Sequence, residues 1–524
     1  MAGAGCSRRA TRHDTTLSRS GPLVWVGTRR QRSKYGSAKS NVLLIFVDNQ
    51  PASMMGCYGN DEIFTPHLDE LASRGVLFRN AFCPNSMCSP CRASVLTGLM
   101  PSQHGIHTWL DDEVMDAWPE HYNAIAEFET LPETLAEAGY QTALIGKYHL
   151  GFADEPQNGF EHWVAMEKGM MDSFYNIPMI DNGRRYTAPE HSVDFFTRKA
   201  VDYLDQHAGK EEAPFFLFFT YNAPYGEMPG PNEPDHRYSN LYKELPMNSV
   251  PREGLCPELI DWILLRKEKL PDWDFAWYKA LAEKPNNLPA MRQFYSQMSM
   301  VDDGVGQLLA KLQEKGVLED TLVIYTADHG LSVGHHGFWG HGEDTWPSNM
   351  HRSANNIPLI ISHPDFAQPG SKSESLVGTT DIFATILEHT GCSVQSTEAI
   401  SGRSLYPLLR GEATEIRDEV FMEQEETRAI RTPQWLFMRR FENTVYDFKH
   451  ELYDLVKDPD ERNNVAQLPE YAAVVAELTG RLDVFFSRYS NPRWDLWKGG
   501  VAKSNSTRPF LWKEVWGDGW APGY

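Results

Sequence analysis

Short apolar runs alternate with amphipathic segments along most of the chain after Asn41. Four runs of strand length end in polar residues: NVLLIFVDNQ (41–50), TALIGKYHLG (142–151), PFFLFFTYNAP (214–224) and TLVIYTADHG (321–330). Amphipathic helices are expected at TPHLDELASRG (65–75), VDFFTRKAVDYLDQH (193–207) and FYSQMSMVDDGVGQLLAKLQEKG (294–316). This alternation predicts an α/β fold with a large mixed, mainly parallel sheet flanked by helices over residues 41–390. In such sheets the active site lies at the carboxyl ends of the strands.

The pattern changes from about residue 391. Shorter strand-like pieces, EVFMEQ, WLFMRRF and ELYDL, precede a helical segment, YAAVVAELTGRLDVFFSRYS. We predict a smaller C-terminal α+β subdomain over residues 391–490 with a short antiparallel sheet. Residues 491–524 are rich in Trp and Gly and are expected to form a tail that packs on the surface.

The first 40 residues differ from the rest of the chain. They are rich in Lys and Arg, contain the single acid Asp14, and have one apolar patch, PLVWVG, which is too short for a signal-peptide core. We expect a disordered or targeting-like extension without a catalytic part. The absence of a clear signal peptide favours a cytoplasmic protein, with export or organelle targeting through the basic extension as the alternative.

Composition narrows the range of partners. The 524 residues carry 49 Lys and Arg against 71 Asp and Glu, a formal charge of −22, which argues against nucleic acid and anionic membranes as partners. No apolar run reaches the length of a membrane span. Seven cysteines in a chain of this length do not make a disulfide scaffold.

Three of the cysteines, Cys83, Cys88 and Cys91, fall within FCPNSMCSPCRASVLTGLMPSQHG (82–105). Their spacing permits an iron–sulfur site, but a fourth thiolate is needed, and Cys256 and Cys392 are distant in sequence. A thiol redox pair would be expected in a small βαβ domain, opening a helix directly after a strand. Neither the iron–sulfur hypothesis nor the redox-pair hypothesis accounts for the residues that follow Cys91.

The longer string Cys88-Ser89-Pro90-Cys91-Arg92, followed by Leu96-Thr97-Gly98, resembles the signature of the type I sulfatases, members of the alkaline phosphatase-like superfamily. The usual serine after proline is Cys91 here. The resemblance extends from about 41 to 466 through further blocks in the same order: GKYHLG (146–151), VDDGVGQLL (301–309), ADHG (327–330), GHHGFWGHG (334–342) and ELYDLVKDPDERNNVA (451–466).

This resemblance implies a cofactor and a modification. Cys88 would be oxidised to formylglycine by a maturation enzyme. One divalent cation would be held by Asp48, Asn49, Asp328, His329 and the formylglycine made from Cys88. Because the family's usual Asp-Asp and Asp-Asn pairs are here Asp-Asn and Asp-His, the site departs from a pure calcium site. Calcium is the first expectation, with manganese and magnesium as alternatives.

The resemblance also assigns roles around this metal. Arg92 would orient the nucleophile, Lys147 would neutralise sulfate oxygens, and His149 would assist release of sulfate, while Asp328 would accept the proton of the attacking group. His341 stands where the family has a lysine and would act as general acid. Tyr225 stands where the family has a histidine and would donate a hydrogen bond or line the substrate pocket. A zinc site built from His335, His336 and His341 is an alternative that the glycine and tryptophan spacing of GHHGFWGHG disfavours.

The resulting hypothesis is a sulfatase that hydrolyses a sulfate monoester, with sulfated carbohydrates among its candidate substrates, through a metal-bound formylglycine hydrate. The alternatives are a phosphonate monoester or phosphodiester hydrolase of the same superfamily and a non-catalytic relative. Substrate choice is expected to depend on residues 106–125, 165–190 and 225–290 and on the tail, which contains the glycosylation sequon Asn505-Ser506-Thr507. The sequence leaves the exact substrate and the oligomeric state open.

Overall fold

A computed structural model describes residues 40–112, 118–171, 173–210, 213–225, 233–269, 283–366, 368–395, 399–442 and 444–524. The predicted N-terminal extension, 1–40, lies outside the described residues except for Ser40. Among the helices of the described ranges, none is long and apolar enough to cross a membrane.

An 11-stranded sheet forms the centre of the fold, with the strand order β11-β2-β12-β8-β1-β7-β3-β4-β5-β6 and β13 alongside β2. Strands β8, β1, β7, β3 and β4 are parallel, whereas β12 and the β5–β6 hairpin run antiparallel to their neighbours. The prediction of a mixed, mainly parallel sheet is therefore confirmed. The strands are β1 (Asn41–Val47), β2 (Val76–Phe82), β3 (Gln141–Gly146), β4 (His162–Met166), β5 (Ile177–Asp181), β6 (Arg184–Ala188), β7 (Phe215–Thr220), β8 (Thr321–Ala327), β11 (Asn356–Ile357), β12 (Leu359–Ser362) and β13 (Ser371–Gly378).

The four predicted strands lie next to one another as β8, β1, β7 and β3, and every residue of β1, β7 and β8 is buried. Strands covered on both faces need continuous apolar sequence, which is why these runs show no polar alternation. In the parallel register Leu44 of β1 lies opposite Phe218 of β7 and Ile324 of β8. The polar residues that follow these strands therefore meet at one edge of the sheet.

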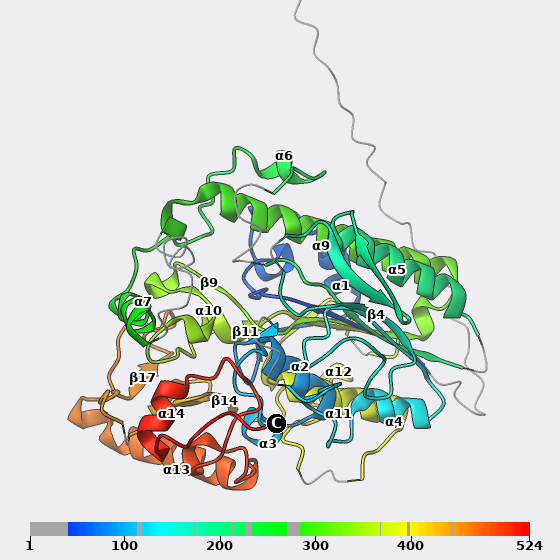
Figure 1. Cartoon of the computed structure of the whole chain (residues 1–524). Coiled ribbons are helices and arrows are strands. Elements are labelled where there is room, and N and C mark those ends of the chain that lie inside the picture. Colours follow the sequence, from blue (N-terminus) through cyan, green and yellow to red (C-terminus); the bar gives the residue numbers. More distant parts are fainter. Residues whose placement is uncertain are drawn as a thin grey trace, which may run out of the picture. The chain divides into compact units, whose positions relative to one another are not determined.

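Helices cover both faces of the sheet (Figure 1). One layer contains α1 (Pro66–Arg74), α5 (Ser192–His207) and α9 (Leu288–Glu314), and the other contains α2 (Cys88–Thr97), α4 (Leu131–Glu137) and α11 (Thr379–Thr390). Further helices are α3 (Pro101–His104), α6 (Ser239–Tyr242), α7 (Pro257–Lys269), α10 (Arg352–Asn355), α12 (Tyr406–Leu409) and α14 (Pro509–Trp516). A two-stranded ribbon pairs β9 (Ser332–Val333) with β10 (Trp339–Gly340).

The VDDGVGQLL block has a structural explanation in α9. The buried Asp302 carboxylate accepts hydrogen bonds from the backbone N–H groups of His67 and Leu68 in the first turn of α1, at 3.3 and 2.8 Å. A Cβ atom at Gly304 would lie 2.1 Å from the Tyr221 hydroxyl, so this glycine permits close approach of α9 to the sheet. The block therefore joins α9 to α1 and to the segment after β7.

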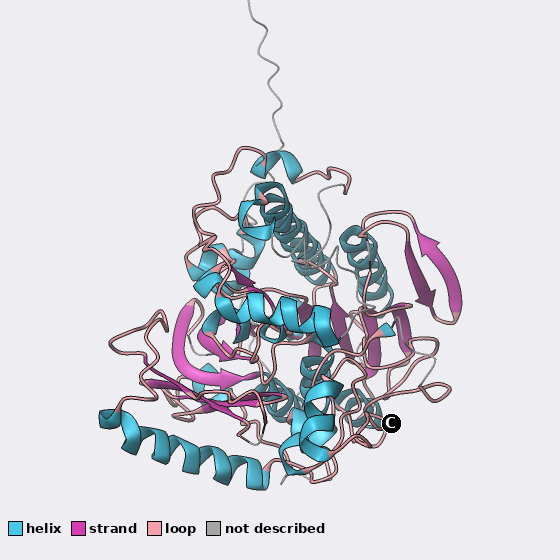
Figure 2. Ribbon diagram, turned by 60° about the vertical axis from the view of Figure 1, so that its left-hand side comes forward, coloured by secondary structure: helices cyan, strands magenta, loops and turns pink. Residues whose placement is uncertain are grey.

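A four-stranded antiparallel sheet occupies the C-terminal part of the chain, as predicted. Its strands are β14 (Val420–Gln424), β15 (Thr427–Arg431), β16 (Trp435–Arg440) and β17 (Glu451–Asp454). Helix α13 (Ala472–Arg488) packs its buried Leu478, Leu482 and Phe486 against Ile430 and Phe437 of this sheet. Figure 2 shows the helix alongside the strands. The predicted boundaries at residues 390 and 490 stay predictions.

The tail, 491–524, contributes to the interior as well as covering the surface. Trp512 and Leu511 are fully buried and share an apolar cluster with Trp262 of α7, Trp346 and Phe441. A Gly- and Trp-rich tail of 34 residues would be costly to order unless it buried apolar surface, and these tryptophans supply that surface.

One contact of the tail predicts a pH effect. The His107 Nε2 atom lies 2.7 Å from the Trp494 carbonyl, and burial lowers the pKa of His107 to about 4. The folded protein therefore holds His107 neutral, while the unfolded chain protonates it below its ordinary value of 6.5. The contribution of neutral His107 to the free energy of unfolding should therefore be fully present above pH 6.5. It should decrease as the pH falls, by about 3 kcal/mol at pH 4. Melting temperatures at pH 7 and pH 4.5 should differ less in a His107→Gln variant; an equal difference in both proteins would contradict this assignment.

Candidate active site

Four side chains converge at the carboxyl ends of the central strands. Asp48 follows β1, Asp328 and His329 follow β8, and Cys88 opens α2. The Cys88 Sγ atom lies 3.5 Å from Asp48 Oδ1 and 3.4 Å from His329 Nε2. One potential ligand atom from each of the four residues lies within 4.8 Å of the others, and all four are buried. We call these four residues the acidic cluster.

The signature residues of α2 each have a local role. Cys88 is the first residue of α2. It therefore lies at the N-terminal end of the helix, where unpaired backbone N–H groups favour an anion. Pro90 lies in the first turn, where a missing N–H is tolerated. The Thr97 hydroxyl donates to the Ala93 carbonyl at 2.7 Å. Gly98 ends the helix at a φ of 72°, a conformation that favours glycine.

Two buried cations neutralise the carboxylates. The Arg92 guanidinium lies 2.9 Å from Asp328 Oδ2 and 3.2 Å from Asp48 Oδ2. The Lys147 Nζ atom lies 2.6 Å from Asp48 Oδ2 and 3.3 Å from Cys88 Sγ. Although burial raises the pKa of Asp48, Lys147 and Arg92 together hold this pKa well below its usual range. Asp48 is therefore ionised at neutral pH.

The Cys88 thiol is a weak nucleophile in its unmodified form. Burial and the nearby Asp48 carboxylate raise the pKa of Cys88 well above its ordinary value. The thiolate, which is the reactive form of cysteine, is therefore disfavoured at neutral pH. This environment suits a residue that is modified before it acts better than a thiol-dependent hydrolase.

The donors of the acidic cluster fit a divalent cation. The His329 Nδ1 atom lies 2.8 Å from the Gly330 carbonyl and donates to it, which leaves the Nε2 lone pair directed toward Cys88. Asp48, Asp328 and His329 are fully buried, and one oxygen or nitrogen atom from each lies within 4.8 Å of the others, a donor set that suits a divalent cation. Asp48, Asp328 and His329 can therefore hold a metal ion.

Asn49 and His341 lie beside the acidic cluster. The Asn49 backbone N–H donates to Asp328 Oδ1 at 3.2 Å, and its side-chain Oδ1 lies 3.0 Å from His341 Nε2. The ligand role predicted for Asn49 stays a prediction, since its carboxamide oxygen faces His341. Asp344, which sequence reasoning missed, accepts from the His341 backbone N–H at 2.8 Å and lies 3.5 Å from its Nδ1.

His149 and Tyr225 complete the set of predicted residues. His149 has a positive φ of 57°, a strained conformation for histidine. Its Nε2 lies 2.7 Å from the Leu110 carbonyl and 3.6 Å from the Asp112 carboxylate. Burial, together with Lys147, lowers the pKa of His149 well below its ordinary value, so the ring is neutral. The Lys147 Nζ atom lies 5.4 Å from the centre of the Tyr225 ring, a cation–π distance.

Asp112 is a second carboxylate that sequence reasoning missed, because no motif marks it. It accepts a hydrogen bond from the Gly169 backbone N–H at 2.6 Å. Burial raises the pKa of Asp112 to about 6. The carboxylate therefore joins His149 to Gly169, within the 165–190 segment that is predicted to influence substrate choice.

The metal-site alternatives from the sequence do not assemble. Within the described ranges, His336 groups with His351 and Glu461, while His341 contacts Asn49, so no cluster unites the three histidines considered for zinc. Nor do Cys83, Cys88 and Cys91 form one cluster; Cys88 alone belongs to the acidic cluster.

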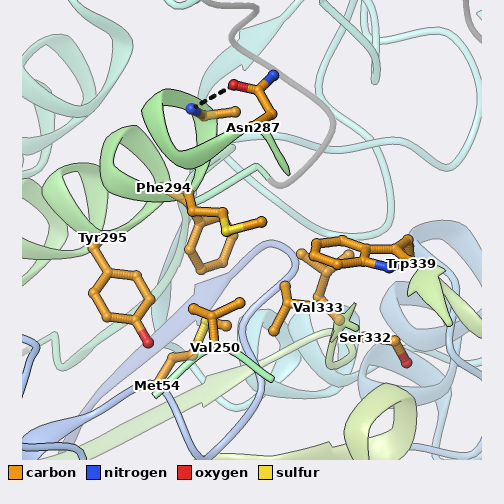
Figure 3. Close-up of a pocket in the computed structure, with 12 residues that line it drawn as sticks. Met54, Val250, Asn287, Phe294, Tyr295, Ser332, Val333 and Trp339 are labelled. Carbon is orange, nitrogen blue, oxygen red and sulfur yellow. Dashed lines mark hydrogen bonds between the residues drawn. The ribbon is translucent and has the colours of Figure 1, made fainter. Parts of the chain in front are cut away.

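A small apolar cavity lies between α9 and the β9–β10 ribbon (Figure 3). Phe294, Val250 and Trp339 are among the residues that line it, and its volume of about 40 Å³ offers room for a few water molecules. Its lining contains none of the predicted site residues. The acidic cluster is therefore the stronger candidate for the active site.

Several known proteins are similar to this chain in sequence or in fold. The N-acetylglucosamine-6-O-sulfatase of Bacteroides thetaiotaomicron is 26% identical over 522 residues, covering 87% of this chain and 88% of the relative. The human N-sulphoglucosamine sulphohydrolase is 28% identical, covering 84% of this chain and 89% of the relative. A solved structure in complex with its substrate D-glucosamine-2-N,6-O-disulfate is 25% identical with a TM-score of 0.68, covering 86% of this chain and 98% of that one.

Profiles of protein families agree with these relatives. The profile described as N-sulphoglucosamine sulphohydrolase, C-terminal, matches residues 337–487. The sulfatase profile matches residues 40–392, more than half of the chain, and this range contains the acidic cluster, Arg92, Lys147, His149 and His341. The chain belongs to the sulfatase family.

Proposed function

We propose that the protein releases inorganic sulfate from a sulfated saccharide, using a nucleophile made from Cys88. As a member of the sulfatase family it is a sulfuric ester hydrolase. The saccharide class rests on the names of its relatives, which act on sulfated glucosamines. The observation that carries the nucleophile is the position of Cys88, whose Sγ lies 3.3 Å from the buried Lys147 ammonium and 3.4 Å from His329.

Two groups would complete the site. A divalent cation held by Asp48, Asp328 and His329, with Asn49 as a further ligand, would supply Lewis-acid neutralisation of the sulfate oxygens. Calcium is the first choice because carboxylate oxygens dominate the set, and the imidazole keeps manganese and magnesium as alternatives. Formylglycine made from Cys88 by a maturation enzyme would supply a hydroxyl nucleophile that a buried thiol cannot.

The protein's own residues prepare this chemistry. Lys147 places a positive charge beside Cys88, where the sulfate oxygens would lie. Arg92 joins the two carboxylates and donates to the Lys147 carbonyl at 2.7 Å, which fixes the lysine backbone. A contact between Lys147 and a sulfate oxygen that gains negative charge would be worth on the order of 2–4 kcal/mol in the transition state.

Proton transfers fall to two histidines. The hydrogen bond from His149 Nε2 to the Leu110 carbonyl places the proton on Nε2, so Nδ1 carries a lone pair that would accept a hydrogen bond and so assist sulfate release. His341, oriented by Asp344 and Asn49, is the candidate acid for the leaving oxygen. Tyr225 lies against Lys147 and would line the sulfate pocket.

The phosphonate alternative is not favoured. A solved phosphonate monoester hydrolase of Agrobacterium radiobacter has a TM-score of 0.64 at 20% identity over 86% of this chain and 96% of that one, a likeness that shows the fold alone. Steady-state rates on paired aryl sulfate and aryl phosphonate substrates test the assignment. We expect a higher kcat/KM for the sulfate; a large preference for the phosphonate would overturn it.

Removal of the cation should stop the reaction. After treatment with EDTA and desalting, sulfate release from a sulfated glucosamine should fall by at least about 100-fold, because the sulfate oxygens would lose the positive charge that the cation supplies. Addition of Ca²⁺, Mn²⁺ or Mg²⁺ in turn should restore it and rank the three ions. A sample desalted without EDTA is the control. Unchanged activity in a sample shown by elemental analysis to be free of metal would contradict the metal site.

A further inference from the structure

We propose that tail residues 503–508, the sequence Lys-Ser-Asn-Ser-Thr-Arg, act as positioning residues that hold both loops flanking the active site. We call this segment the strap. The two loops are 107–112, which contacts His149, and 342–348, which follows His341. The inference rests on the proposed function, since it concerns how the sulfatase site is kept in shape. The strap lies outside the ranges 40–392 and 337–487 that the two family profiles match.

The strap hydrogen-bonds along the first loop. The Ser504 hydroxyl accepts from the backbone N–H groups of His107 and Thr108 at 3.3 and 3.2 Å. The Asn505 side chain accepts from the Asp111 N–H at 2.7 Å and donates to the Asp111 carbonyl at 2.9 Å. The Ser506 hydroxyl donates to Thr108 Oγ1 at 2.7 Å. Backbone N–H and carbonyl groups of the first loop, which would otherwise bind solvent, are thus hydrogen-bonded to side chains of the strap.

This first loop reaches the chemistry through His149. The Leu110 carbonyl, one residue before Asp111, lies 2.7 Å from His149 Nε2, and the Asp112 carboxylate lies 3.6 Å from the same atom. The Leu110 N–H donates to Ser89 Oγ at 3.0 Å, next to Cys88. A shift of Asp111 would therefore move the partners that set the proton position and orientation of His149.

Arg508 holds the second loop. Its NH2 atom donates to the carbonyls of Glu343 and Thr345 at 2.6 and 3.1 Å. Its NH1 atom donates to Ser348 Oγ at 2.9 Å and lies 3.0 Å from the Glu426 carboxylate. The Arg508 side chain is 2% exposed. Because Glu343 and Thr345 flank Asp344, which contacts His341, the arginine fixes the loop that orients the candidate acid.

The guanidinium also packs against tryptophan. It lies 4.3 Å from the Trp262 ring and 5.0 Å from the Trp346 ring. Planar stacking and five forked donors are properties that lysine lacks, so this position requires arginine.

The same contacts account for the sequon Asn505-Ser506-Thr507. Both polar atoms of the Asn505 amide bond the Asp111 backbone, and the Thr507 hydroxyl lies 2.8 Å from Ser504 Oγ. A glycan on Asn505 Nδ2 would replace one of its two hydrogens and would have to fit beside the Asp111 backbone. We therefore assign the three residues to packing of the strap.

An Asn505→Ala variant tests the strap without touching the catalytic residues. It removes both bonds to Asp111, and two hydrogen bonds of ordinary strength correspond to about ten-fold or more in a local opening equilibrium. Hydrogen exchange of the full-length protein should therefore be about ten-fold faster in residues 107–112. The control is Asn464→Ala: Asn464 Oδ1 accepts from the backbone N–H groups of Leu452 and Ala466, both at 3.0 Å, in the C-terminal part of the chain.

Kinetics on a sulfated glucosamine supply the second readout. Asn505→Ala should lower kcat by about five-fold or more through His149, while Asn464→Ala leaves kcat and KM at wild-type values. Arg508→Lys should accelerate exchange in 342–348 in the same way. Unchanged exchange in 107–112, or faster exchange with wild-type kinetics, would overturn the proposal. If the wild-type protein released no sulfate, the proposed function would fail, and the exchange measurement would still decide whether the strap holds the loops.

Discussion

A Cys88→Ala variant is expected to lose at least about 10⁴-fold in kcat for sulfate release, since removal of a covalent nucleophile leaves only the contribution of binding and charge stabilisation. The fold should survive, because alanine fits the start of α2 and the neighbouring Lys147 keeps its contact with Asp48 at 2.6 Å. The measurement is steady-state release of inorganic sulfate, with the melting temperature recorded for both proteins.

The neighbouring thiol supplies a matched control. Cys91 is equally buried and lies one helical turn from Cys88, where its Sγ faces the Asn85 carbonyl at 3.3 Å. Cys91→Ser keeps a donor at this position and should retain activity. The mass of the proteolytic peptide containing Cys88 should be lower than that of the cysteine form in active enzyme. Full activity of Cys88→Ala, or active enzyme with an unmodified Cys88, would exclude the formylglycine mechanism.

Much of the fold was predictable because the central strands are covered on both faces. Complete burial of β1, β7 and β8 requires unbroken apolar runs, and such runs are visible in a single sequence. Parallel pairing of adjacent strands then brings their polar ends together, so Asp48, Lys147 and Asp328 meet without any further information. The antiparallel additions at both edges of the sheet carry weaker patterns and were not specified strand by strand.

The parts of the site that escaped prediction depend on contacts between distant segments. Asp111 and Asn505 are 394 residues apart, and Ser348 and Arg508 are 160 apart. No local periodicity records such pairings, and the tail showed only its composition. Asp344, by contrast, lies three residues after His341, a spacing at which a side chain can cap a turn, so a search for local partners of His341 would have found it.

An Asp48→Ala variant should show the second large effect, on both activity and stability. Asp48 is fully buried, and its Oδ2 atom compensates Lys147 at 2.6 Å and Arg92 at 3.2 Å. Loss of one partner from a buried ion network leaves uncompensated charge, which costs about 3–5 kcal/mol. Loss of Asp48 as the proposed metal ligand should also reduce kcat/KM by at least about 10³-fold. The melting temperature and the kinetics should therefore both fall.

Asp381→Ala separates the two effects. Asp381 is also fully buried and forms an ion pair with Arg417, while its Oδ2 accepts from the Gly378 N–H at 2.7 Å at the start of α11. Its removal should lower the melting temperature to a similar extent but leave kcat within a few-fold of wild type. Calorimetric titration with Ca²⁺ should show binding to metal-depleted Asp381→Ala and none to Asp48→Ala. Equal loss of activity in both variants would mean that Asp48 acts through stability alone, and undiminished Ca²⁺ binding by Asp48→Ala would remove it from the metal site.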